Sequence, residues 1–280
     1  MSRTAPPLGA LVRSWRELRH VSQLDLASEA DISQRHLRFI ESGRAAPSRA
    51  MIITLASHLD VPLRERNSLL LAAGFAPIYK DRPFNHPGLV QARAALERLV
   101  KAHEPYPALI IDRLWTLVRA NAAVAPLLVG ADPELRKPPV NLMRLSLHPK
   151  GLAPLIENLA EWRAHLLDRL QRQHRITRDP AVDELLKEIT TYPDPASHKA
   201  PRTDCSRDHL QDAIVVPLRL RTRTGVLSFL STVTVFGTAI DITLSELSLE
   251  AFYPADEATE AALMTHRPRA SRETCQTSDS

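Results

Sequence analysis

Four side chains able to form several hydrogen bonds lie between positions 34 and 38, namely Gln34, Arg35, His36 and Arg38. In a helix, Gln34, Arg35 and Arg38 share the outer face, and His36 lies near its start. An arginine pairs bidentately with guanine, and a glutamine with adenine, in the major groove of DNA. The pattern therefore predicts a helix that reads base edges, with a merely solvent-exposed face as the alternative.

Other residues of reactive type do not form a catalytic or metal-binding pattern. His165 and His174 are nine residues apart, which is not the spacing of two metal ligands on one helix face. Asp204, Cys205 and His209 lie in a segment predicted as a loop, where no base is rigidly held. The G-x-S-x-G, H-E-x-x-H, P-loop and G-x-G-x-x-G motifs are absent from the sequence. We therefore expect no enzyme, no catalytic residues, no metal and no cofactor.

The net positive charge of the chain lies in its N-terminal part. Residues 1–80 hold eleven Lys or Arg and seven Asp or Glu, whereas residues 81–280 hold 25 of each kind. A basic segment before a neutral one suggests contact with a polyanion, and a basic solvated surface is the alternative. Two cysteines exclude a disulfide framework, and neither a membrane-spanning run nor a signal peptide is visible. We expect a cytoplasmic, nucleoid-associated protein without a membrane partner.

Five short helices are predicted to position the Gln34 face. Apolar spacing and capping signals place them at 8–20, from 23, at 34–42, from 49, and at 62–74. Ser22 and Ser33 are the predicted N-caps of the second and third helices, which are joined by a three-residue turn at 30–32. Two helices with such a turn form a helix-turn-helix.

The stretch SQLDLASEADISQRHLRFIESGRAAPS resembles the lambda-repressor-like XRE family of regulators, and the resemblance covers residues 8–75. Asp31 stands where the family usually has glycine, and aspartate tolerates the left-handed backbone better than most residues. The resemblance implies an ion pair between Arg16 and Glu41, and dimeric binding to a pseudo-palindromic operator in double-stranded DNA. The alternative is a helical domain that only dimerises or binds another protein. The candidate DNA-binding residues are Gln23, Ser33, Gln34, Arg35, His36, Arg38, Arg44 and Arg49.

The rest of the chain is predicted to mix helices and strands. A Pro-containing linker and a helix occupy 77–103. A hairpin at 108–121 precedes a helix that runs through Leu128, with Asn121 as its predicted N-cap. Helices are expected along 152–170 and after Asp179, and a loop at 193–212. Strands are expected at 214–221, 226–236, 240–243 and 247–253. The predicted division is 1–76 for DNA binding, 77–103 as linker and junction helix, 104–264 for the second domain, and 265–280 as a disordered tail.

Within that second domain, stretches such as HEPYPALIIDRLWTLVRANAA, NLAEWRAHLLDRL and LSFLSTVTVFGT resemble the MmyB-like ligand-binding domain. The resemblance implies a PAS-like α/β fold, an antiparallel sheet with helices, whose pocket holds a fatty-acid-like molecule. Bulky apolar residues on both faces of 226–236 suggest that both are covered. The candidate ligand-binding residues are Trp115, Trp162, Arg163, His165, Leu166, Phe229, Thr232, Thr234 and Phe236.

Each candidate also has a plainer interpretation. The tryptophans fit an ordinary core, and Arg163 and His165 fit solvated helix positions, although they could hold a carboxylate. Arg219, Arg221 and Arg223 alternate with apolar residues, which favours an exposed sheet face over an acidic head-group site. We thus expect a multidomain, dimeric transcription regulator with an all-α N-terminal domain and a PAS-like effector domain. The alternative is a DNA-bound interaction factor with no small-molecule ligand.

Overall fold

The computed structural model describes residues 7–193, 216–223, 225–236 and 241–265. Contacts divide the chain into two compact units, the first drawn from 1–91, 172–179 and 235–247, and the second from 92–171, 180–234 and 248–280. Each unit is described separately. The predicted loop at 193–212 lies outside the described residues except for its first residue, and so does the predicted tail except for residue 265.

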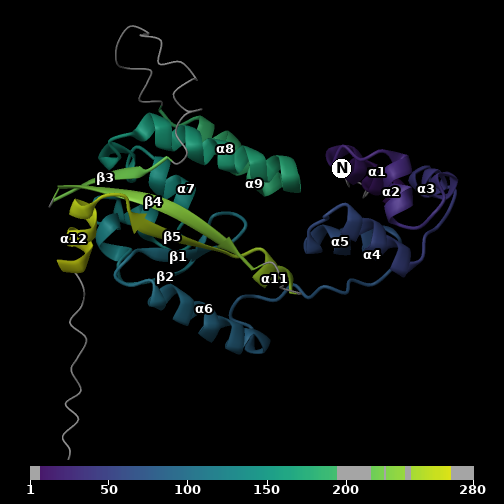
Figure 1. Ribbon diagram of the computed structural model, residues 1–280, viewed down its shortest axis with the longest axis horizontal. Coiled ribbons are helices and arrows are strands. Elements are labelled where there is room, and N and C mark those ends of the chain that lie inside the picture. The colour runs from purple at the N-terminus through teal and green to yellow at the C-terminus, as the bar shows by residue number, and fades with distance from the viewer. Residues whose placement is uncertain (1–6, 194–215, 224, 237–240, 266–280) are drawn as a thin grey trace, which may run out of the picture. The chain divides into compact units, whose positions relative to one another are not determined.

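Five helices form the N-terminal part of the first unit (Figure 1). They are α1 (Leu8–Leu18), α2 (Gln23–Glu29), α3 (Gln34–Glu41), α4 (Arg49–His58) and α5 (Leu63–Ala72). The Ser22 and Ser33 side chains accept the backbone N–H groups of Asp25 and His36, so both predicted N-caps are confirmed. Asp31 has a φ of 53°, the left-handed conformation expected for it. The turn thus survives without glycine.

After α5 the chain forms further helices of different lengths and five strands. The helices are η1 (Pro87–Leu89), α6 (Val90–Ala102), η2 (Ala125–Leu128), η3 (Pro133–Arg136), α7 (Leu142–Leu147), η4 (Ala153–Leu155), α8 (Leu159–Thr177), α9 (Pro180–Thr190), α11 (Ile242–Ser245) and α12 (Glu257–Thr265). The strands are β1 (Ala108–Ile111), β2 (Leu117–Ala120), β3 (Leu218–Thr222), β4 (Gly225–Val235) and β5 (Ser248–Pro254).

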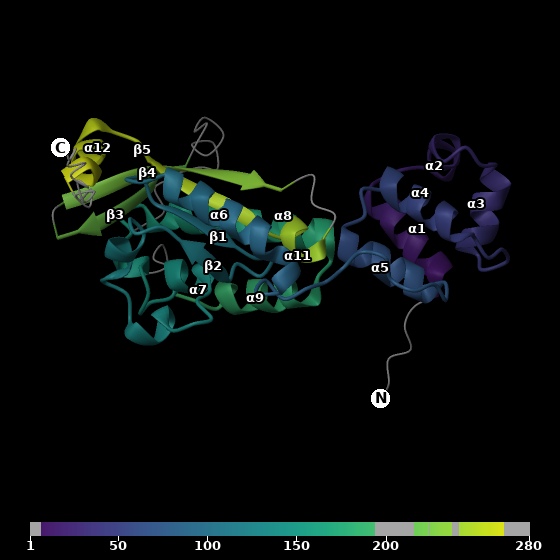
Figure 2. The same ribbon diagram turned by 90° about the horizontal axis from the view of Figure 1, so that it is seen from below.

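The strands make one sheet in the order β2-β1-β5-β4-β3. The pairings of β1 with β2, β1 with β5, and β3 with β4 are antiparallel. Side chains alternate between the two faces of a strand, and on β1 Leu109 and Ile111 join a core with residues of α7, α8 and α9. Figure 2 shows the sheet of this unit from below, with α6 in front of β1. The predicted mixed α/β architecture is therefore confirmed.

Two predictions about local structure are wrong. Asn121 does not cap a helix, because its side chain accepts the N–H of Ala108 and donates to the carbonyls of Val100 and Tyr106. These three bonds hold β1 to the end of α6 instead. Where a strand was expected at 240–243, Ile242 and Thr243 belong to α11, because the Asp241 side chain accepts the N–H of Thr243 and caps that helix.

Burial along β4 is uneven, so the covering of its second face by a helix, a ligand or a partner stays a prediction. Leu227 and Phe229 are buried, but Val233 is 45% exposed and Val235 is 65% exposed. Apolar residue type alone does not show burial, because much of a protein surface is apolar. Only the first half of β4 contributes to the core.

Candidate functional site

The outer face of α3 carries the side chains predicted to read DNA. Gln34, Arg35 and Arg38 are exposed, whereas Leu37 and Ile40 on the opposite face are fully buried. The Arg35 guanidinium carbon lies 5.3 Å from the centre of the Phe39 ring, within range of a cation–π contact. The structure therefore places three hydrogen-bonding side chains together on one solvent-facing surface of a short helix.

The carboxylate of Glu41 fixes the orientation of α3. Arg16 of α1 donates to it twice, with Nε 2.7 Å from Oε1 and Nη2 3.0 Å from Oε2. Gln23 of α2 donates from Nε2 to Oε2 at 2.7 Å. The hydrogen bond to Glu41 also raises the pKa of Arg16. Glu41 thus joins three helices, as the family resemblance implied for Arg16 and Glu41.

The other DNA-binding candidates surround this face. His36 is half-buried, and its backbone N–H donates to the Ser33 hydroxyl oxygen. The proton of that hydroxyl can still be donated to another acceptor. Arg44 and Arg49 are exposed, and Arg49 donates to the carbonyl of Ala76 at 3.1 Å. Gln23 keeps one amide hydrogen beyond its bond to Glu41. Their contacts with DNA remain predictions.

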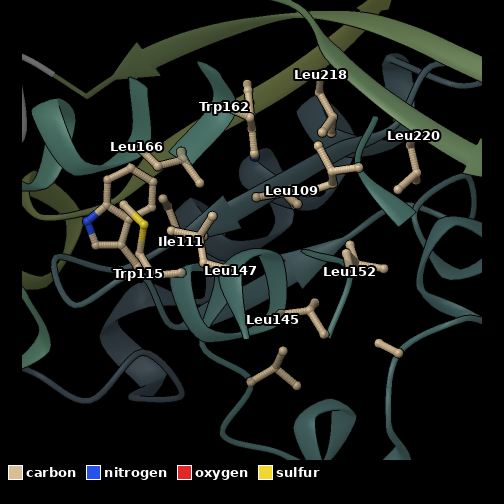
Figure 3. Close-up of a cluster of buried hydrophobic side chains, with 14 of the residues drawn as sticks. Leu109, Ile111, Trp115, Leu145, Leu147, Leu152, Trp162, Leu166, Leu218 and Leu220 are labelled. Atoms are coloured by element: carbon tan, nitrogen blue, oxygen red, sulfur yellow. The ribbon is translucent and has the colours of Figure 1, made fainter. Parts of the chain in front are cut away.

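The second unit contains an inner cavity of about 90 Å³ between the sheet and helices α7 and α8. Trp115, Trp162 and Leu166, three of the predicted ligand-binding residues, line it. Figure 3 shows these side chains among the buried leucines of the same core. The Trp162 indole N–H donates to the Ser146 hydroxyl at 3.0 Å, so the ring has a fixed orientation. The cavity wall is otherwise almost wholly apolar.

Glu250 is the one charged residue lining this inner cavity within the described chain, and it is 3% exposed. Its Oε1 accepts from Arg169 Nη1 at 2.8 Å, and the Arg169 guanidinium carbon lies 4.5 Å from the centre of the Trp115 ring. Trp115 has a φ of 64°, a strained conformation for a bulky residue, held by the Asp112 carboxylate in the preceding turn. The sequence analysis missed Arg169 and Glu250.

A larger outer groove of about 650 Å³ lies beside η2, α12 and the hairpin of β3 and β4. This volume falls within the usual range for small-molecule sites. Leucine, alanine, proline and valine side chains make up most of the wall, and Leu127 also lines the inner cavity. The charged lining residues are Glu104, Arg221 and Arg223. The sequence analysis weighed the two arginines without choosing them as site residues.

The remaining ligand-binding candidates lie outside both spaces. Arg163 is buried and donates to the carbonyls of Ile189 and Thr190 at the end of α9. His165 stacks on Trp162 at 5.4 Å, and Phe229 is fully buried in the core. Thr232 and Thr234 are exposed, and Phe236 is half-buried. The structure therefore brings together three of the nine predicted residues, and the roles of all nine remain untested.

In the described part of the chain no three His, Cys, Asp or Glu side chains are grouped so that they could hold a metal ion. No described helix has the length and apolar character needed to cross a membrane.

Comparisons with known proteins match two different family models to two parts of the chain. A family model described as the MmyB-like transcription regulator ligand binding domain matches residues 92–265, more than half of the chain. A helix-turn-helix model matches residues 12–66. These matches confirm both predicted resemblances and the predicted fold classes, a helix-turn-helix domain followed by a PAS-like α/β domain.

Two solved structures show weaker similarity. The clp gene regulator ClgR from Corynebacterium glutamicum is 23% identical, with 36% of this chain and 99% of that chain covered and a TM-score of 0.22. An RNA-binding light-oxygen-voltage receptor is 14% identical, with 92% of this chain and 60% of that chain covered and a TM-score of 0.26. No curated protein matches the chain.

Proposed function

We propose that this chain, which belongs to the MmyB-like transcription regulators, binds operator DNA through α3 and an apolar effector through its second unit. The observation that carries the DNA-binding part is the exposed face of Gln34, Arg35 and Arg38, held by Glu41. Side chains on the second helix of a helix-turn-helix reach base edges, while flanking residues contact phosphates. Acting on DNA would place the protein in the cytoplasm, at the nucleoid.

Dimeric binding to a pseudo-palindromic operator is part of the proposal. One helix-turn-helix makes few phosphate contacts, and a second copy adds a second set. The half-sites would lie ~34 Å apart, one turn of DNA. A footprint over two half-sites is expected, and a footprint over one half-site by a monomer would contradict dimeric binding.

Two alanine variants test the DNA-binding part. Sequences selected from a random pool by the wild-type chain supply the operator. Arg35→Ala is expected to relax sequence preference at a cost of about 1–3 kcal/mol, because a base contact is lost. Arg49→Ala is expected to weaken binding to all DNA sequences by the same factor, because a phosphate contact is lost. Arg136→Ala, an exposed arginine of η3, is the control. Unchanged operator binding by both test variants would refute the assignment of α3.

The effector is proposed to be fatty-acid-like, an apolar chain with one polar end. The support is the outer groove, which has the volume of a small-molecule site and a mostly apolar wall. Native mass spectrometry of the chain purified from its host, with thermal shift by added fatty acids, tests this. A retained lipid is expected. Its repeated absence, with no thermal shift, would favour an interaction factor without a ligand.

A further inference from the structure

We infer that the effector is a hydrocarbon chain that ends in a carboxylate. The carboxylate binds at Arg223 in the outer groove, and the hydrocarbon is directed towards Leu127 and the inner cavity. This inference rests on the proposed binding of a fatty-acid-like molecule and adds the orientation and the residue that recognises the head group. The two spaces differ as surroundings for a carboxylate.

The inner cavity disfavours a carboxylate. Glu250 is its charged wall residue, and the cation beside it, Arg169, is already bonded to Glu250 at 2.8 Å. A ligand carboxylate there would add a second negative charge to a pair that is already balanced, in surroundings with little water. Hydrocarbon brings no such charge, and the apolar wall around Trp115 and Trp162 suits it.

The arginine on α8 that was considered as a head-group partner is used elsewhere. Arg163 donates to the carbonyls of Ile189 and Thr190 at 3.1 and 3.4 Å, which closes the end of α9. It also lines neither the inner cavity nor the outer groove. Reaching a ligand would require breaking both bonds in a buried place.

The outer groove offers a cation that is not already used by its neighbours. Arg221 lies 3.5 Å from the Glu157 carboxylate, whereas the Arg223 side chain has no ion pair with any described residue. Glu104, the groove's one carboxylate among the described residues, accepts the N–H of Ala122 at 3.3 Å. Arg223 is exposed, so a head group bound there keeps part of its water and avoids the cost of burial.

The hairpin of β3 and β4 borders both spaces. Leu218 and Leu220 of β3 line the inner cavity. Arg221 and Thr222 at the end of β3, and Arg223 in the turn that follows, line the groove. Leu127 lines both spaces, so the two are neighbours. A hydrocarbon that starts at Arg223 would run along the apolar wall of the groove towards Leu127.

The test compares decanoate with decanol, which differ only in the head group, by calorimetric titration of the full-length chain. Arg223→Glu is expected to weaken decanoate binding about fivefold, the size of one exposed ion pair, and to leave decanol binding unchanged. Added salt should reduce decanoate binding to the wild type but not to this variant. Arg219→Glu is the matched control, since Arg219 is exposed on β3, the strand that precedes Arg223, and lines neither space.

The outcomes separate the inference from the proposed function. If neither ligand binds the wild type, the proposed effector site is wrong. If decanoate binds and Arg223→Glu weakens it no more than Arg219→Glu does, the orientation is wrong while the effector site stands. If Arg169→Met loses decanoate binding while Arg223→Glu binds decanoate as the wild type does, the carboxylate lies in the inner cavity.

Discussion

The carboxylate of Glu41 shows how one residue can organise a binding surface without taking part in binding. Its side chain is 4% exposed and that of Arg16 is 11% exposed, so their ion pair is largely shielded from water. Removing one member of a shielded pair leaves the other charge unsatisfied, which costs more than the pair contributes. This explains why an acidic residue lies beside the surface proposed to bind DNA.

Glu41→Gln is therefore expected to lower the free energy of unfolding by about 2–3 kcal/mol, measured by urea titration. Glu17→Gln is the control, because the ion pair of Glu17 with Arg13 is exposed on α1 and contributes little. Equal losses in the two variants would show that the Glu41 pair has no special structural role.

The Glu188 carboxylate of α9 predicts a dependence of stability on pH. Hydrogen bonds from Arg144 hold the pKa of Glu188 below its usual 4.5, against the opposing effect of burial. A carboxyl with a lowered pKa stabilises the fold above its unfolded pKa, and this contribution is lost as the pH falls through the lower, folded pKa. Stability measured at pH 6 and pH 3.5 should fall less in Glu188→Gln than in the wild type. An identical fall would contradict the role of this pair.

At the scale of elements, α1 and α3 approach closely because Gly9 has no side chain. A Cβ built on Gly9 would lie 2.5 Å from the backbone oxygens of Ile40 and Glu41. Gly9→Ala is therefore expected to lower the free energy of unfolding by about 1–3 kcal/mol, because backbone atoms must shift. Gly43→Ala tests backbone strain instead of a steric clash. A Cβ on residue 43 would meet no atom within 4 Å, but the φ of +73° is unfavourable for alanine. Retention of wild-type stability in Gly9→Ala would contradict the close approach.

The turn between α2 and α3 gives a second prediction at this scale. Asp31 has a φ of 53°, which glycine adopts freely and β-branched residues avoid. Asp31→Gly should keep the unfolding free energy within about 0.5 kcal/mol, since relief of strain offsets the greater freedom of the unfolded chain. Asp31→Val should lower the free energy of unfolding by about 1–2 kcal/mol. A valine variant as stable as the glycine variant would contradict the assigned turn.

Capping residues and helical stripes predicted the first unit well because they act between neighbouring residues. Ser22, Ser33 and Asp31 each have the local role that their residue type suggests. Asn121 and Glu250 were misjudged or missed because their partners, Val100 and Arg169, are distant in sequence. An isolated glutamate between the apolar Leu249 and Ala251 was the available signal for Glu250. Cavity walls depend on such long-range contacts, so only three ligand-site candidates came together.

At the scale of the whole molecule, the chain joins a DNA-binding unit to an effector unit. An effector can change DNA affinity only by preferring one arrangement of the protein over another. We expect this preference to pass along residues 77–103, the predicted linker and junction helix, which lead from the helix-turn-helix match at 12–66 into the match that begins at residue 92. The coupling is reciprocal, so DNA should change effector affinity by the same factor.

The central claim is tested most directly by the affinity of the chain for its selected operator, titrated with and without saturating decanoate. The account predicts a change of roughly 5–150-fold, the usual size of such coupling, with the same factor when decanoate is titrated with and without operator. Decanoate that binds the chain while operator affinity stays the same would contradict it.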